Sequence, residues 1–299
     1  MKKQTIRLPL IFSLLVIFLF AAFAQDSLSQ SKKSFLWKVQ SKTNTVYVLG
    51  SIHYLKKEMY PLDEKIEKAF DQSNILGVEA NVDDTSKMDV QKLVESAFYS
   101  GDETLEKHVS PEAFELVKKQ LTELSASLEA ANKYRPWFLA LSLASIEIVK
   151  LGFDPNYGID RYFLSKATEK KKIVELESLE YQINLFSALS EKDQELFLLY
   201  TLKDIKVLEQ ELDKLVMAWA AGDEKGIESI MTKSIKEDKK LIPIYEKLVV
   251  ERNRKMVSKI EEYLKEKETF FVIVGAGHLV GNQGIIELLK GKGFSLEQL

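Results

Sequence analysis

Residues 46–53 read VYVLGSIH and residues 270–278 read FFVIVGAGH, and these two stretches decide the fold. Each is an apolar run typical of a buried strand that ends at a glycine, with a histidine three residues further on. In a parallel α/β sheet, ligands bind in the crevice outside the carboxyl ends of the strands. The pattern therefore predicts that His53 and His278 meet at one edge of a sheet, although they stand near opposite ends of the chain. The alternative is that both are ordinary histidines in turns that end strands.

Residues 1–24 have the features of a secretory signal peptide. A basic start precedes the apolar run 8–20, which ends at the small-residue cleavage pattern Ala22-Phe23-Ala24. We expect this leader to be cleaved before Gln25 and the chain to be exported to the periplasm or the extracellular space. We expect contact with a membrane only through the leader. An uncleaved anchor is the alternative, although the run is shorter than the ~20 residues that a spanning helix needs.

Composition narrows the class of protein. The formal net charge of −3 provides no basic surface for nucleic acid. The chain has no cysteine, so an exported form has no disulfide and no thiolate ligand, and its stability must come from a core. Because no Gly/Ser-rich or repeated stretch interrupts the chain, we expect a single domain over residues 25–299. Nothing in the sequence indicates an oligomeric state.

The expected elements indicate an α/β fold. Short apolar runs bounded by turn residues predict strands at residues 34–40, 45–49, 75–80, 172–176, 270–274 and 294–299. Helices are expected at 62–72 and 282–292, and residues 86–267 are mostly helical, with Pro111 and Pro136 at helix starts. We therefore expect a mixed central sheet assembled from N-terminal and C-terminal βα units, with a large, mainly helical middle that covers or extends the site.

Glu79 is the natural companion of the two histidines. It interrupts an apolar run at the end of a strand that we expect beside the first histidine strand, where an unpaired charge is costly. Two imidazoles and a carboxylate are typical ligands of a divalent transition metal, and they leave positions open for water. The sequence therefore predicts a metal ion, Mn, Co or Zn, held by His53, Glu79 and His278. The alternative for Glu79 is a water-facing position on an edge strand. The third histidine, His108, follows neither a glycine nor a strand, and we expect it in a loop or at a helix end.

At these motifs the chain resembles the TraB/GumN family, which includes the Tiki metalloproteases. The resemblance covers nearly the whole of residues 25–299 and rests on an ordered set of segments: 35–39 (FLWKV), 49–53 (LGSIH), 76–79 (LGVE), 158–160 (GID), 175–177 (ELE) followed by Gln182, 251–254 (ERNR) and 274–281 (VGAGHLVG). It implies an α/β fold of two related halves and, as in Tiki, a metal-dependent peptidase that acts on an extracellular substrate. Ser51 stands where many relatives have threonine.

The resemblance also points to Asp160, Glu177, Arg252 and Asn253. A guanidinium at Arg252 could stabilise negative charge on a metal-bound carbonyl, and the Asn253 amide could do the same or orient a ligand. Asp160 could handle protons or simply cap a helix, and Glu177 could orient an imidazole. The alternative for Arg252 is an ordinary surface position in a charged run.

Together these patterns predict an exported metal-dependent hydrolase with a peptide or protein substrate. The metal would lower the pKa of a bound water from about 15.7 toward about 7. The chain has no Gly-x-Ser-x-Gly elbow, Walker loop or His-Glu-x-x-His helix, so serine-hydrolase, nucleotide-dependent and zincin functions lack their motifs. The alternative from another class is a non-catalytic binding protein that uses the same cleft to sequester a peptide or a haem-like ligand.

Overall fold

The computed structural model describes residues 33–84, 86 and 89–299, and the expected leader, residues 1–24, lies outside them. Lys33–Leu299 form one compact unit. No helix in the described part of the chain combines the length and the apolar character that crossing a membrane requires.

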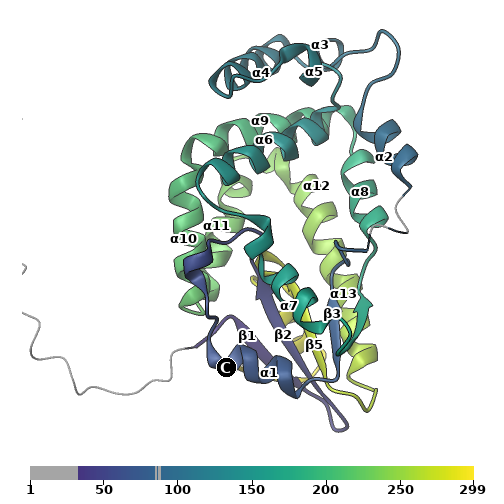
Figure 1. Ribbon diagram of the computed structural model, residues 1–299, viewed down its shortest axis with the longest axis vertical. Helices are drawn as coiled ribbons and strands as arrows, with labels where there is room; N and C mark the ends of the chain where they lie inside the picture. The colour runs from purple at the N-terminus through teal and green to yellow at the C-terminus, as the bar shows by residue number, and fades with distance from the viewer. Residues whose placement is uncertain (1–32, 85, 87–88) are drawn as a thin grey trace, which may run out of the picture. The chain divides into compact units, whose positions relative to one another are not determined.

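The centre of this unit is a six-stranded sheet in the order β4-β3-β5-β2-β1-β6 (Figure 1). Its strands are β1 (Leu36–Gln40), β2 (Thr45–Ser51), β3 (Ile75–Val78), β4 (Lys172–Glu175), β5 (Phe270–Gly275) and β6 (Ser295–Gln298). Strands β4, β3, β5 and β2 run parallel, while β1 is antiparallel to both β2 and β6. The predicted α/β fold, with a mixed sheet built from both ends of the chain, is confirmed.

Strand β5 lies inside the parallel part of the sheet, between β2 and β3, and it is apolar on both faces. Phe270 to Val274 are all buried, as expected for a strand that helices cover on both sides. Ser51 pairs with Gly275, so the two histidine strands lie side by side. However, β3 pairs with β5 and not with β2, so the expectation that the Glu79 strand neighbours the first histidine strand is wrong. The chain that connects β2 to β3 leaves room for one strand between them in the sheet, and β5 occupies that place.

Helices occupy most of the chain between β3 and β5, as the apolar spacing predicted. They are, together with one helix before β3 and one after β5, α1 (Glu64–Gln72), α2 (Val90–Ala97), α3 (Leu105–His108), α4 (Pro111–Glu123), α5 (Leu128–Ala131), α6 (Pro136–Lys150), α7 (Ile159–Ala167), α8 (Leu179–Ser187), α9 (Glu191–Asp204), α10 (Leu208–Ala220), α11 (Glu224–Glu237), α12 (Ile242–Tyr245), α13 (Glu251–Tyr263) and α14 (Ile285–Gly291). Pro111 and Pro136 are the first residues of α4 and α6, as predicted, and the Ser110 hydroxyl accepts a hydrogen bond from the Ala113 N–H.

Neighbouring phenylalanines of β5 show which helices cover each face of the sheet, because successive side chains of a strand point to opposite faces. Phe271 packs against Phe70 of α1 and Phe163 of α7, with ring centroids 5.5 and 5.0 Å away. Phe270 stacks on Tyr263 of α13 at 4.3 Å. The sheet is therefore covered by α1 and α7 on one face and by α13 on the other.

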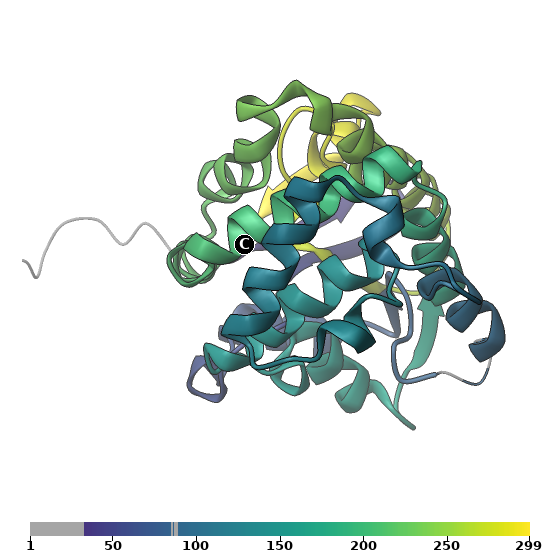
Figure 2. The ribbon, with the colours of Figure 1, turned by 90° about the horizontal axis from the view of Figure 1, so that it is seen from above.

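The middle helices have an apolar core of their own, in which α4, α6 and α9 pack around buried residues such as Val117 and Leu143. Figure 1 shows α6 and α9 beyond one end of the strands, and Figure 2 shows the helical middle from above, over the sheet. The Tyr54 hydroxyl, one residue after His53, lies 2.9 Å from the Ser145 hydroxyl of α6. This contact shows that the helical middle meets the sheet at the carboxyl ends of its parallel strands.

Candidate functional site

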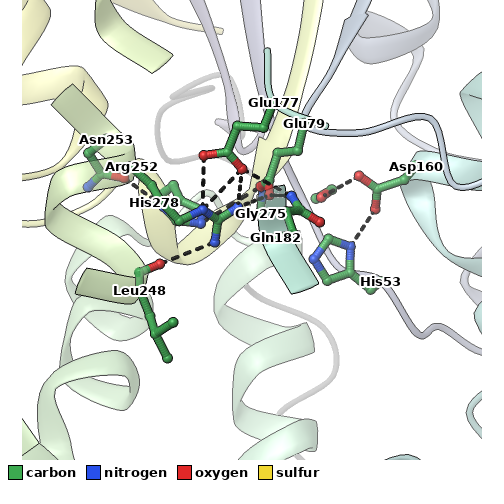
Figure 3. Close-up of polar contacts among 11 residues, drawn as sticks. His53, Glu79, Asp160, Glu177, Gln182, Leu248, Arg252, Asn253, Gly275 and His278 are labelled. Atoms are coloured by element: carbon green, nitrogen blue, oxygen red, sulfur yellow. Dashed lines mark hydrogen bonds and ion pairs between the residues drawn. The ribbon is translucent and has the colours of Figure 1, made fainter. Parts of the chain in front are cut away.

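The two histidine motifs meet over Gly275. His53 follows β2, and His278 closes the 3₁₀ turn Ala276–His278 directly after β5. A methyl group placed on Gly275 would lie 3.6 Å from His53 Nε2, 3.6 Å from His278 Cδ2 and 3.3 Å from Glu79 Oε1. The three predicted ligands therefore surround one point at the carboxyl edge of the sheet (Figure 3), and the glycine leaves that point open.

The ring of His278 is fixed through its Nδ1 atom. Asn253 Oδ1 lies 2.6 Å from Nδ1, and the Asn253 amide nitrogen donates to the Gln283 carbonyl oxygen at 2.8 Å. Because a carbonyl can only accept, the amide oxygen faces the ring and His278 Nδ1 carries the proton. Burial lowers the pKa of His278 below its ordinary value of 6.5, so at pH 7 the ring is neutral and Nε2 has a free lone pair.

His53 is held in the same manner by a carboxylate. Its Nδ1 lies 2.8 Å from Asp160 Oδ2, and Asp160 Oδ1 accepts a hydrogen bond from the Ser51 hydroxyl at 3.1 Å. The charge of Asp160 raises the pKa of His53 to about 9, against the opposing effect of burial. The His53 side chain is nevertheless 60% exposed, so solvent screening weakens this shift. Both imidazoles thus bind a neighbour through Nδ1 and present Nε2 to the same point.

Asp160 reaches His53 because the start of α7 lies directly on the backbone of His53. The Ile159 N–H donates to the Ile52 carbonyl oxygen at 3.1 Å. A Cβ on Gly158 would lie only 2.2 Å from the His53 carbonyl oxygen, so no residue with a side chain fits there without displacing the helix. The first turn of α7, which lies wholly within the described residues, has no side-chain cap, so Asp160 orients the imidazole instead of capping the helix.

Both carboxylate oxygens of Glu79 have partners. Oε1 accepts a hydrogen bond from the Gly275 N–H at 2.6 Å, and Oε2 accepts from Arg252 Nη2 at 2.5 Å and from the Gln182 amide at 3.1 Å. Burial raises the pKa of Glu79, but the charges of His278, Arg252 and His53 and the Gly275 N–H outweigh it and lower that pKa to about 2. Arg252 is the one of these three side chains whose charge does not depend on pH in this range, so it keeps the glutamate ionised at pH 7. Oε1 lies 3.8 Å from His278 Nε2.

Arg252 is enclosed by two glutamates. Its Nε and Nη2 atoms donate to Glu177 at 2.8 to 3.1 Å, Nη2 also donates to Glu79, and Nη1 donates to the Leu248 carbonyl oxygen at 3.2 Å. The side chains of Arg252 and Glu177 are only 12% and 2% exposed, and the Gln182 amide contacts both glutamates.

These contacts change the roles expected for Arg252 and Glu177. Arg252 is not a surface residue, and its donors are engaged by carboxylates, so it does not offer the free guanidinium that would stabilise charge on a substrate. Among the described residues, Glu177 binds this arginine and not an imidazole. The expected carboxylate partner of an imidazole is Asp160 instead.

A cavity of about 300 Å³ opens onto this cluster. Its lining combines site residues with the loops that follow the strands, namely His53, Tyr54, Glu79, Ala80, Val82, Pro155, Asp160, Arg161 and Gln182. This volume lies at the lower end of the roughly 300–1,000 Å³ of small-molecule sites, so a small ligand or part of a larger one fits. A larger hollow of about 690 Å³ between α10 and α11 contains none of the predicted site residues.

The described residues include no group of three His, Asp or Glu side chains already spaced to hold a metal ion. Glu79 and His278 are buried together, 9% and 10% exposed, whereas His53 stands at the mouth of the cavity. The three predicted ligands are therefore neighbours, but they are not at coordination distances.

Three contributors to the site have no signal of their own in the sequence. Ser51 was visible only as part of the first motif, and Gln182 only as part of the family resemblance. The Leu248 carbonyl lies in the π-helical turn Glu246–Val250, directly before α13. Such turns occur often at functional sites, but no residue pattern marks them.

Comparison with known proteins agrees with the motifs. The model of the TraB/PrgY/gumN family matches residues 35–298. The chain belongs to this family. The predicted resemblance is thereby confirmed, and it extends over the whole sheet and the helices between its two ends.

Two relatives match along most of their length. An uncharacterized protein, YbaP, of Escherichia coli (strain K12) is 26% identical over 248 residues, which cover 82% of this chain and 87% of that protein. An uncharacterized protein of Treponema pallidum (strain Nichols) is 20% identical over 282 residues, 89% of this chain and 83% of that protein. A metalloprotease TIKI homolog of Amphimedon queenslandica is 39% identical over 54 residues, 17% of this chain and 11% of that protein. No solved structure matches the chain significantly.

Proposed function

We propose that this protein is an exported metal-dependent hydrolase that cleaves peptide bonds in a peptide or protein substrate. The observation that carries the proposal is the pair of imidazoles whose Nδ1 atoms are taken by Asp160 and Asn253, while both Nε2 atoms face one ionised glutamate (Figure 3). Metal-binding histidines have this arrangement, in which one ring nitrogen donates to an oxygen and the other binds the ion. Family membership and the short similarity to a metalloprotease TIKI homolog support the same function.

The donor atoms of the site fit a divalent cation. Glu79 Oε1 and His278 Nε2 are both acceptors, and they face each other across 3.8 Å in a buried space. Two buried acceptors in this position are unfavourable unless a proton or a cation lies between them. A metal ion would satisfy both, and His53 Nε2, which faces the same point over Gly275, would be a third donor once the ion displaces the proton that Asp160 favours on that ring. Two imidazoles and a carboxylate suit Mn, Co or Zn.

In this proposal His53, Glu79 and His278 hold the ion, which supplies a polarising charge and a bound water of lowered pKa. Asp160 and Asn253 keep the two rings turned so that Nε2 faces the site. Because Asp160 is engaged by His53 and Ser51, its contacts suit orientation of the ring better than transfer of a proton.

Arg252 and Glu177 act on Glu79 from the side away from the cavity. The guanidinium keeps the glutamate ionised and fixes its direction, and Glu177 with Gln182 holds the guanidinium in place. These residues are positioning residues. The substrate enters through the cavity, whose lining includes both His53 and Glu79.

Metal content is the first test. The chain 25–299, purified from an exporting host, should contain Mn, Co or Zn, and His278→Ala should lose it. His108→Ala is the matched control, because His108 contacts Glu103 and Glu191 in the helical middle and does not line the cavity. Absence of metal from the wild-type protein would refute the proposed metal-dependent function.

Activity is the second test. The wild type should cleave members of a randomised peptide library, and chelator or His278→Ala should stop cleavage while His108→Ala does not. Metal binding without cleavage of any peptide would favour the alternative, a binding protein for a peptide or a haem-like ligand. Sequencing of the mature N-terminus should begin at Gln25, and retention of the leader in a membrane fraction would contradict export as a free protein.

A further inference from the structure

We infer that Arg161 makes the cavity selective for substrates that present a carboxylate next to the cleaved bond. The inference rests on the proposed function, because it concerns the same cavity. Arg161 lines that cavity together with His53 and Glu79. Neither the family motifs nor the two histidine motifs include it.

The acidic residues of the cavity already have close cationic or imidazole partners. Glu79 binds Arg252 at 2.5 Å, and Asp160 binds His53 at 2.8 Å. Arg252 and His53 are therefore engaged by these carboxylates, and neither is free to bind a carboxylate of a substrate.

Arg161 supplies a cation without a close counter-charge. Its Nε lies 3.7 Å from Asp83 Oδ1, which is beyond hydrogen-bonding distance, and the two side chains are 41% and 52% exposed. Solvent therefore screens this pair, and most of the positive charge remains available to a ligand.

The guanidinium is nevertheless held in position. Arg161 Nη1 donates to Asn156 Oδ1 at 2.8 Å, and the backbone N–H of Asn156 donates to the Asp154 carboxylate, also at 2.8 Å. Within the described part of the chain, Nη2 has no hydrogen-bond partner. A guanidinium with one anchored and one free nitrogen can receive a carboxylate with little loss of side-chain freedom.

The position of Arg161 in the chain connects it to the reacting groups. Asp160 and Arg161 are consecutive residues in the first turn of α7, so one rigid turn orients His53 and also presents the cation. Tyr54, Val82 and other apolar lining residues provide surface for the rest of a peptide. The bound carboxylate is either the C-terminal carboxylate of a peptide or the side chain of an Asp or Glu residue, which present the same chemistry.

Binding of short peptides tests the inference independently of catalysis. We would measure fluorescence anisotropy with N-terminally dansylated alanine pentapeptides, with and without chelator, on the chain 25–299. One pair of peptides differs in a free or amidated C-terminus, and a second, amidated pair differs in one Glu or Gln. The wild type should bind the charged member of at least one pair about tenfold more tightly, as a charge-assisted contact at a partly exposed position implies.

Arg161→Ala should abolish this preference, and Arg161→Lys should keep only part of it, because lysine has the charge without the planar fork. Lys170→Ala is the matched control, since Lys170 is exposed beyond the other end of α7 and does not line the cavity. Thermal unfolding would verify that the variants are folded.

The pair that shows the preference identifies the source of the carboxylate. The inference is overturned if the wild type prefers neither charged peptide, binds no peptide, or keeps its preference in Arg161→Ala. Cleavage of peptides without a carboxylate preference would overturn this inference and leave the hydrolase proposal intact. A carboxylate preference without cleavage would support this inference and overturn the hydrolase proposal.

Discussion

Replacement of Arg252 by alanine should destabilise the folded protein by about 3–5 kcal/mol at pH 7. It leaves the side chains of Glu79 and Glu177, 9% and 2% exposed, without the cation that both contact. Removal of one partner from a buried ion pair has a cost of this size because the remaining charge is uncompensated. The charges of His278, Arg252 and His53 together lower the pKa of Glu79 from its ordinary 4.5 to about 2, so the loss of Arg252 removes part of that shift.

The effect of Arg252→Ala should depend on pH. In the wild type, the pKa of Glu79 lies below its ordinary value, so its contribution to stability is complete above pH 4.5 and is lost as the pH falls toward 2. In the variant, burial and the neighbouring charge of Glu177 raise the pKa of Glu79, so the cost of its charge disappears when the pH falls below that raised pKa. The stability difference between wild type and variant is therefore largest at neutral pH and smaller in mild acid.

Urea unfolding followed by circular dichroism at pH 7.5 and pH 4.5 measures this difference. Adding Glu177→Gln to Arg252→Ala removes one of the two buried charges and should recover part of the loss at pH 7.5. Arg254→Ala is the control, because Arg254 lies on the same helix, is 55% exposed, and contacts Glu246 at 2.9 Å and the Gln283 side chain at 3.4 Å; it should cost less than about 1 kcal/mol. A loss below about 1 kcal/mol at pH 7.5, or an equal loss at both pH values, would refute the reasoning.

Three further predictions follow from single contacts. In the metal-free protein, NMR should show a pKa of His53 above its ordinary value of 6.5, and Asp160→Asn should lower it because the neighbouring charge is lost; an unchanged pKa would contradict this pairing. Asn253→Ala should weaken metal binding by about 10–100-fold in a chelator competition while the ligands stay intact, and an equal affinity would count against the proposed orientation of the ring. Gly158→Ala should destabilise the folded protein by about 1–3 kcal/mol, because the new Cβ would lie 2.2 Å from the His53 carbonyl oxygen. Gly291→Ala should not destabilise it, because a Cβ there meets nothing within 4 Å, and equal losses of stability in the two variants would disprove the close approach at Gly158.

Local signals in the sequence were sufficient for the elements of the fold. The two proline helix starts and the N-terminal hairpin follow from the propensities of a few adjacent residues. The strand order did not follow, because β5 is apolar on both faces and such a strand has no alternation that shows its neighbours. Whether β2 lies beside β3 or beside β5 depends on contacts between distant segments.

The same limit applies to the site. Residue type and position after a strand were enough to select His53, Glu79 and His278. The pairing of Arg252 with Glu177 was not predictable, because Arg252 lies in a charged run that resembles a solvent-facing helix surface, and one of its partners is a carbonyl of the π-helical turn before α13, which no residue pattern marks. Sequence identifies charged candidates, whereas the direction of each side chain depends on tertiary packing.

The position of β5 also makes the site depend on segments from both ends of the chain. The carboxylates of the cluster come from residues 79–177, before the end of the helical middle, whereas the cation Arg252 and the Gly275 N–H come from the C-terminal segment. Until that segment docks, β2 and β3 have no strand between them, and Glu79 and Glu177 have no counter-charge.

A chain that ends after Leu264 keeps Arg252 but lacks β5, so the slot in the sheet stays open and Glu79 loses the Gly275 N–H. We expect this truncated chain to lack cooperative unfolding in circular dichroism and to bind no metal. Addition of a synthetic peptide of residues 265–299, which spans β5, the His278 turn, α14 and β6, should restore both, because the peptide supplies the missing strands and the missing donors together. Metal binding by the truncated chain alone would contradict the view that the fold and the site are completed by the same strand.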